Sequence, residues 1–116
     1  MNRYEDLKIW KKAMDLVEDV YLLMKQLPND EKFALISQIK RSSISIPSNI
    51  AEGAGRNSKK EFRHFLSIAN GSTSELETQL ILVHRLKFVK KDSVKPIIKK
   101  CNEIRKMSYA LQKSLN

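Results

Sequence analysis

Apolar residues recur along this chain at steps of three and four positions, and charged residues fill the positions between them. Because an α-helix turns once in about 3.6 residues, this spacing places the apolar side chains on one face of a helix. Four segments follow the pattern, and in the second the apolar stripe runs from Phe33 through Ile39 and Ile46 to Ala54. The four predicted helices span residues 4–27, 31–54, 58–87 and 93–115.

Short connections join these long helices, and the chain has the length of one domain with one core. These features predict an all-α fold, an up-down-up-down antiparallel four-helix bundle that forms a single domain over residues 1–116. The composition agrees, since the 116 residues include only three glycines and three prolines.

Local signals mark the expected helix ends. Gly53 and Gly55 predict that the second helix terminates in a left-handed conformation. Residues 58–61, Ser-Lys-Lys-Glu, predict a capping box in which the serine is the N-cap and the glutamate reaches back to it. Asp92 or Ser93 is the expected N-cap of the last helix.

Two residues interrupt the helical pattern. Pro47 removes a backbone donor inside the second helix, which costs about 3 kcal/mol or kinks the helix. The kink is either tolerated or shapes a subunit contact or cavity, and the sequence leaves both open. Gly71 costs about 1 kcal/mol relative to alanine in a helix interior. We expect another backbone to approach closely at Gly71, from the second helix or from another subunit.

The charge of the chain is large and unevenly placed. The formal net charge is +9 and the pI is about 9.8. Residues 1–57 hold nine basic and eight acidic residues, whereas residues 58–116 hold 13 and five. This excess indicates either a solvated face or a surface that contacts nucleic-acid phosphates with little sequence specificity. The residues that we assign to this nucleic-acid-binding surface are Arg85, Lys87, Lys90, Lys91, Lys95, Lys99 and Lys100.

A second polar group lies on the two central helices. Asn49 and Glu52 are three positions apart on the second helix, and Ser72 and Glu75 are three apart on the third. If these helices pack antiparallel, the two pairs meet. They then form either a hydrogen-bonded network that fixes the register, a subunit contact or a binding pocket.

No catalytic, metal or cofactor site is predicted. His64 and His84 lie 20 positions apart on one helix and face opposite ways, so they cannot share a metal ion. Cys101 lies on an apolar stripe and is expected to be a buried structural thiol. The first residues show no signal peptide, and no apolar run is long enough to span a membrane. We expect a cytoplasmic protein with no membrane partner.

Residues 45–53, Ser-Ile-Pro-Ser-Asn-Ile-Ala-Glu-Gly, carry a family resemblance. Together with residues 72–77, Ser-Thr-Ser-Glu-Leu-Glu, and the opening Tyr-Glu-Asp-Leu-Lys-Ile-Trp of residues 4–10, they resemble the proteins encoded in intervening sequences of bacterial 23S ribosomal RNA genes. The resemblance implies a four-helix bundle that assembles into a ring-shaped homo-oligomer, a pentamer. That family is similar to the accessory variability determinant of diversity-generating retroelements, a basic pentamer that binds nucleic acid and a reverse transcriptase.

The charge and the resemblance together predict a non-enzymatic, homo-oligomeric accessory protein that binds nucleic acid, with RNA favoured over DNA. A reverse transcriptase is a candidate protein partner by the resemblance alone. One alternative is a structural or partner-binding scaffold that binds no nucleic acid. A further alternative is a metal-dependent nuclease that uses Glu52 and Glu75.

Overall fold

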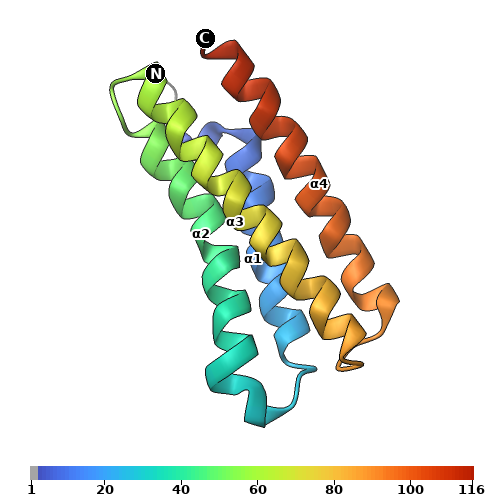
Figure 1. The fold of residues 1–116 in the computed structure, drawn as a ribbon. Helices are drawn as coiled ribbons and strands as arrows, with labels where there is room; N and C mark the ends of the chain where they lie inside the picture. The colour runs from blue at the N-terminus through green and yellow to red at the C-terminus, as the bar shows by residue number, and fades with distance from the viewer. Residues whose placement is uncertain (1–2) are drawn as a thin grey trace.

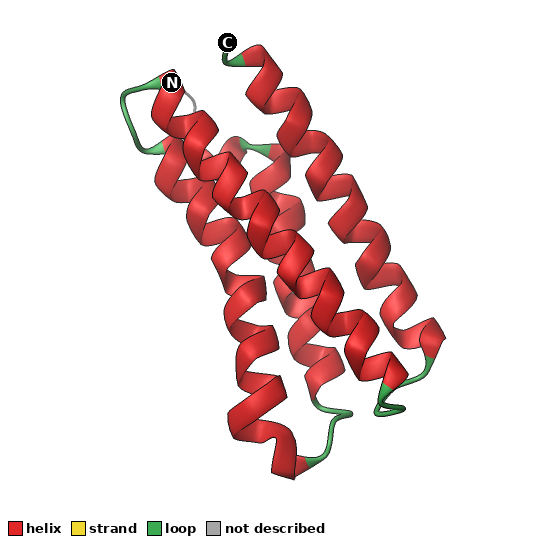
Figure 2. Cartoon of the chain, in the orientation of Figure 1, coloured by secondary structure: helices red, strands yellow, loops and turns green. Residues whose placement is uncertain are grey.

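Four long helices make up most of the computed structural model, which describes residues 3–116 (Figure 1). No strand occurs in that range, and the predicted all-α class is confirmed (Figure 2). The connections between the helices are short, and the bundle measures 43 × 24 × 20 Å along its principal axes. The helices are α1 (Lys8–Met24), α2 (Ser37–Ala54), α3 (Lys59–Arg85) and α4 (Lys91–Ser114).

The core runs along the centre of the bundle and takes side chains from every helix. Leu16 of α1, Ile46 of α2, Leu76 of α3 and Ile104 of α4 have no solvent-exposed surface. Each such side chain contributes about 1.5–3 kcal/mol by leaving water, so the shared core is the main reason that the four helices associate. None of the helices in residues 3–116 is long and apolar enough to cross a lipid bilayer.

The chain begins differently from the prediction. Residues expected to open the first helix form a 3₁₀ turn instead, η1 (Tyr4–Asp6), and the extended backbone of Leu7 separates that turn from α1. The Tyr4 ring packs edge-on against Trp10 with 5.4 Å between ring centroids. This aromatic contact packs the first turn against α1.

The entry to the second helix is also irregular. A 3₁₀ turn, η2 (Asn29–Glu31), leads into a five-residue π-helical turn, η3 (Lys32–Ile36), before α2 begins. Phe33 was expected on the apolar stripe, but it is 89% exposed. Because a π-turn is wider than an α-turn, residues within it rotate away from the face that regular helical spacing predicts.

Gly53 lies where α2 packs closely against α3. A Cβ atom at this position would lie 2.7 Å from the Cβ of Phe65 and 3.0 Å from a ring carbon of Phe62. The expected left-handed ending is wrong, because no described glycine has a positive φ and Gly55 has a φ of −79°. The glycine at position 53 serves helix packing and not chain reversal.

Gly71, where we expected a close approach, has an open surface in the isolated chain. No atom lies within 4 Å of a Cβ built at this position, so the expectation that the second helix approaches there is wrong. The open surface is compatible with the alternative, an approach by another subunit.

We expect Gly71→Ala to raise the free energy of unfolding by about 1 kcal/mol, because alanine favours a helix interior and meets nothing here. Urea denaturation followed by circular dichroism measures the change. This expectation holds for the isolated chain, and a clear loss of stability would indicate that another subunit approaches Gly71 closely.

The start of α3 follows the predicted cap in part. Ser58 Oγ accepts a hydrogen bond of 3.1 Å from the Glu61 backbone N–H, as an N-cap does. The Glu61 carboxylate does not return to Ser58. It lies 3.7 Å from the Arg56 guanidinium, so an ion pair replaces the second half of the capping box.

The turn from α3 to α4 lies two residues earlier than predicted. Lys87 has a φ of 66°, and the Phe88 N–H donates to the Val83 carbonyl at 3.1 Å, which is the hydrogen bond of a Schellman motif. The chain reverses at Lys87, and α4 begins at Lys91 with Lys90 as its N-cap. The expected caps Asp92 and Ser93 are therefore wrong, because they lie inside the helix.

Glycine favours the conformation of Lys87 more than any residue with a side chain does. We therefore expect Lys87→Gly to raise the free energy of unfolding by up to about 1 kcal/mol. Lys87→Ala is the matched control, since it removes the same charge and keeps a Cβ atom at the left-handed position. If Lys87→Ala raised the free energy of unfolding as much as Lys87→Gly does, backbone strain would not be the cause.

Candidate functional site

Seven basic residues surround the turn between α3 and α4, and we call them the turn patch. Arg85 ends α3, Lys87 and Lys90 lie in the connection, and the others occupy the first turns of α4. Lys91, Lys95 and Lys99 recur every four positions and therefore share one face of α4. The turn patch consists of Arg85, Lys87, Lys90, Lys91, Lys95, Lys99 and Lys100.

Ion pairing in the turn patch is sparse, as it is at several basic residues elsewhere, such as Lys59 and Lys60. Within residues 3–116, Lys100 alone among the seven forms an ion pair, with Asp19 of α1. By contrast, Lys12 pairs with Glu103 at 2.6 Å and Arg105 pairs with Glu77, so these cations connect neighbouring helices. Six exposed cations thus remain without an acidic partner at one end of the bundle.

On α4, Asp92 lies within the patch beside Lys91, and Glu103 lies three positions after Lys100. The hydrogen bond from Lys12 lowers the pKa of the Glu103 carboxyl, and the charges of Lys99 and Lys100 lower the pKa further. A carboxyl whose pKa is lowered by folding stabilises the folded state at pH values above its pKa in the unfolded chain. This stabilisation is lost as the pH falls through the pKa in the folded state. Glu103 therefore stays ionised near neutral pH and is already engaged by Lys12.

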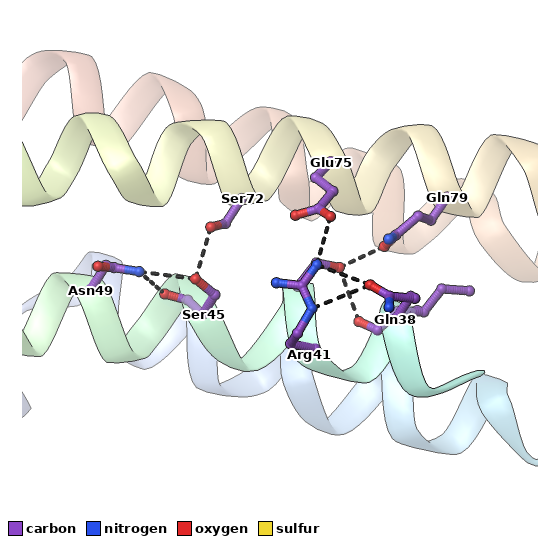
Figure 3. Close-up of polar contacts among 9 residues, drawn as sticks. Gln38, Arg41, Ser45, Asn49, Ser72, Glu75 and Gln79 are labelled. Atoms are coloured by element: carbon purple, nitrogen blue, oxygen red, sulfur yellow. Dashed lines mark hydrogen bonds and ion pairs between the residues drawn. The ribbon is translucent and has the colours of Figure 1, made fainter. Parts of the chain in front are cut away.

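The polar group on α2 and α3 separates into two clusters (Figure 3). In one, the hydroxyls of Ser45 and Ser72 lie 2.9 Å apart, and the Asn49 side-chain nitrogen donates to Ser45 Oγ at 2.9 Å. Asn49 also donates to the Ser45 carbonyl at 2.8 Å. The structure thus joins Asn49 and Ser72 through Ser45, which the sequence analysis did not identify.

In the other cluster, Arg41 is the central residue. Its guanidinium donates to Glu75 at 2.8 Å and to Gln38 at 3.1 Å, both at the exposed edge of the α2–α3 contact (Figure 3). Next to it, the buried Ser42 hydroxyl donates to Gln79 at 2.6 Å. These hydrogen bonds link α2 to α3. The spacing of residues in the sequence did not indicate that Arg41 would pair with Glu75.

Glu52 and Glu75, the pair considered for a nuclease, have separate partners. Glu52 pairs with Arg56 at 2.9 Å, whereas Glu75 pairs with Arg41. The two arginines are 15 positions apart on α2 and the turn after it, or about 22 Å at 1.5 Å per residue. No group of three or more His, Cys, Asp or Glu side chains in the described part of the chain is placed to hold a metal ion.

The histidines and the cysteine lie apart from both groups. His64 is exposed near the start of α3, with its ring edge-on to Phe65, and His84 is half-buried beside the turn patch. Cys101 is fully buried in the core, and this burial raises the pKa of its thiol to about 12. A thiol held protonated in this way is a poor nucleophile, which agrees with a structural cysteine.

An apolar groove of about 330 Å³ lies between α1 and α2. Pro47 is buried along it, and Met14 and Ile44, on its rim, are 41% and 43% exposed. Pro47 thus lies inside α2 and lines a groove between helices, and both interpretations of its role stay open. The lining residues are Tyr4, Trp10, Met14, Val17, Ile44, Pro47, Ser48 and Ala51.

The fold and the surface together define an all-α helical bundle with unpaired positive charge at one end. Residues 5–110 match the model of the 23S rRNA-intervening sequence protein family, and the chain belongs to that family. The predicted resemblance is thereby confirmed.

One solved structure is similar over nearly its whole length. It is a protein of unknown function from the S23 ribosomal protein family of Bacteroides thetaiotaomicron. It shares 29% sequence identity with this chain and superposes with a TM-score of 0.83, covering 90% of this chain and 98% of its own. No match is found among curated proteins. The comparisons therefore define the family and the fold and assign no function.

Proposed function

We propose that this protein is a non-enzymatic accessory protein that binds nucleic acid, RNA in preference to DNA, as a homo-oligomer in the cytoplasm. The observation that carries the proposal is the turn patch, where six exposed cations have no acidic partner among residues 3–116. When unpaired lysines contact the phosphates of a nucleic acid, the counterions condensed on those phosphates are released. This release makes binding favourable and dependent on the salt concentration. A basic surface that served solubility alone would not need to be concentrated at one turn.

Backbone phosphates, and not base edges, are the proposed contacts. The lysines of α4 stand on a regular helix at intervals of four residues, a spacing that suits repeated contacts along a strand. The test is a binding titration with a labelled structured RNA and with duplex DNA of equal length. Tighter binding to the RNA supports the proposal, and equal or tighter binding to the DNA would overturn the RNA preference.

We further propose an up-down-up-down antiparallel order of the helices and a ring-shaped homo-oligomer, a pentamer by family resemblance. In Figure 1 the α1–α2 connection and the α3–α4 turn lie at one end of the bundle, and the α2–α3 connection lies at the other, which supports the antiparallel order. The groove between α1 and α2 and the open surface at Gly71 on α3 support assembly, because a ring joins two different faces of each subunit.

The second candidate function is a scaffold that assembles and recruits a protein partner without nucleic acid. The groove that Pro47 lines favours it, since exposed apolar surface marks interaction sites. Ile44→Glu places a charge on the groove rim at a position that is already 43% exposed, so the isolated fold should persist. Analytical ultracentrifugation should show dissociation of the oligomer, and unchanged assembly would remove this groove from the interface.

A further inference from the structure

A hollow of about 630 Å³ lies beside the turn patch, between the end of α1 and the α3–α4 turn. Two of its lining residues, Phe88 and Val89, are apolar, and the other five are polar or basic. No carboxylate lines it. The polar lining residues are Gln26, His84, Lys87, Lys90 and Ser93.

The polar side chains of this hollow have no partners inside the protein. Among residues 3–116, none of the five forms a side-chain hydrogen bond or an ion pair, and His84 Nδ1 is shielded from solvent without a hydrogen-bond partner. Polar atoms that are buried are almost always paired. His84 Nδ1 is the buried atom of this set, whereas Gln26, Lys87 and Lys90 are exposed and therefore free to contact a ligand in the hollow.

Two features of the backbone place these donors. Lys87 adopts the left-handed conformation that reverses the chain, and it lines the hollow together with Phe88 and His84. Lys90 is the N-cap of α4, and no side chain caps this helix. The first N–H groups of α4 add positive potential to that of the two lysines. A residue held in an unfavourable conformation is also common at binding sites.

We infer that this hollow binds the terminal phosphate of a nucleic-acid strand, and the inference rests on the nucleic-acid function proposed above. A terminal phosphate monoester presents three acceptor oxygens and carries a charge of about −1.5 to −2 near pH 7, as a phosphorylated side chain does. An internal phosphodiester has two free oxygens and one negative charge, and chain leaves it on both sides. A concave set of two ammonium groups with further donors matches the strand end better than it matches the strand interior.

The test compares one short RNA in three forms, with a 5′-phosphate, with a 3′-phosphate, or with hydroxyls at both ends. We expect one phosphorylated form to bind about tenfold more tightly than the hydroxyl form, the equivalent of one charge-assisted hydrogen bond. Equal binding of all three forms would overturn the pocket and leave the nucleic-acid function standing. An absence of binding by every form at low salt would overturn both.

The double variant Lys87→Gly, Lys90→Ser removes both charges and suits the backbone, because glycine favours the left-handed position and serine is a good N-cap. It should lose the preference for the phosphorylated end. The matched control, Lys95→Gln with Lys99→Gln, removes two charges outside the hollow and should weaken all three RNA forms by the same factor. A preference retained by the double variant would contradict the inference.

A free nucleotide is the other source of the same phosphate chemistry. Competition with a nucleoside 5′-monophosphate and a nucleoside 3′-monophosphate distinguishes the two sources. If the strand end is the ligand, the mononucleotides should compete far more weakly than the phosphorylated RNA, because they make no contact with the rest of the turn patch. Competition at the same concentration as the RNA would overturn the strand-end assignment.

Discussion

Replacing Lys91, Lys95 and Lys99 together with glutamate should weaken RNA binding by about three orders of magnitude near 0.1 M salt. The three side chains are exposed on one face of α4 and form no ion pair in residues 3–116. Each phosphate contact contributes about 0.9 to the slope of log affinity against log salt, so the slope should also fall by about three. Glutamate is tolerated in the first turns of a helix, and the fold should persist.

The control for this triple variant makes an equal change in net charge at the other end of the bundle. Lys59, Lys60 and Lys113 are also exposed and also form no ion pair within the described residues. Replacing them with glutamate lowers the net charge equally, and we expect a much smaller loss of affinity. Equal losses for the two triple variants would mean that total charge, and not the turn patch, determines binding.

Replacing Gly53 with valine should lower the free energy of unfolding by about 3 kcal/mol, the upper part of the usual range for overpacking. The nearest atom to the new Cβ would be the Cβ of Phe65 at 2.7 Å, which is fixed to the α3 backbone and cannot rotate away. The two helices would have to separate. Helix propensity alone favours a residue other than glycine, so the predicted loss has the opposite sign from that preference.

Gly55→Ala is the matched control for this position. A Cβ at Gly55 would lie 3.5 Å from the Ala51 carbonyl oxygen, which is ordinary contact, and the φ of −79° suits alanine. Thermal unfolding should show little change or a small gain for this variant and a large loss for Gly53→Val. A stable Gly53→Val protein would contradict the close approach of α2 and α3.

Much of the fold could be predicted from the sequence, because the apolar spacing of each helix is regular and the core residues follow it. Ile39 and Ile46 are fully buried as that spacing requires, and Ser58 caps α3 as its sequence motif requires. The prediction failed where the backbone is irregular. Phe33 left the stripe because a π-turn precedes α2, and no periodic pattern encodes such a turn.

The glycines show a second limit of sequence reasoning. A glycine within a helix predicts close packing but does not say which glycine meets a neighbour, and the contact lies at Gly53 and not at Gly71. Likewise, a run of lysines does not show which of them are paired. The structure separates Lys100, which binds Asp19, from the six that have no partner, and it shows the hollow that Lys87 and Lys90 share.

The most direct test of the central claim is a salt titration of the unmodified protein with a labelled structured RNA. The account predicts a steep linear fall of log affinity with log salt, with a slope of about −5 if the six unpaired cations of the turn patch contact phosphates. No binding at low salt, or binding that does not change with salt, would contradict the proposed nucleic-acid interface and favour the scaffold.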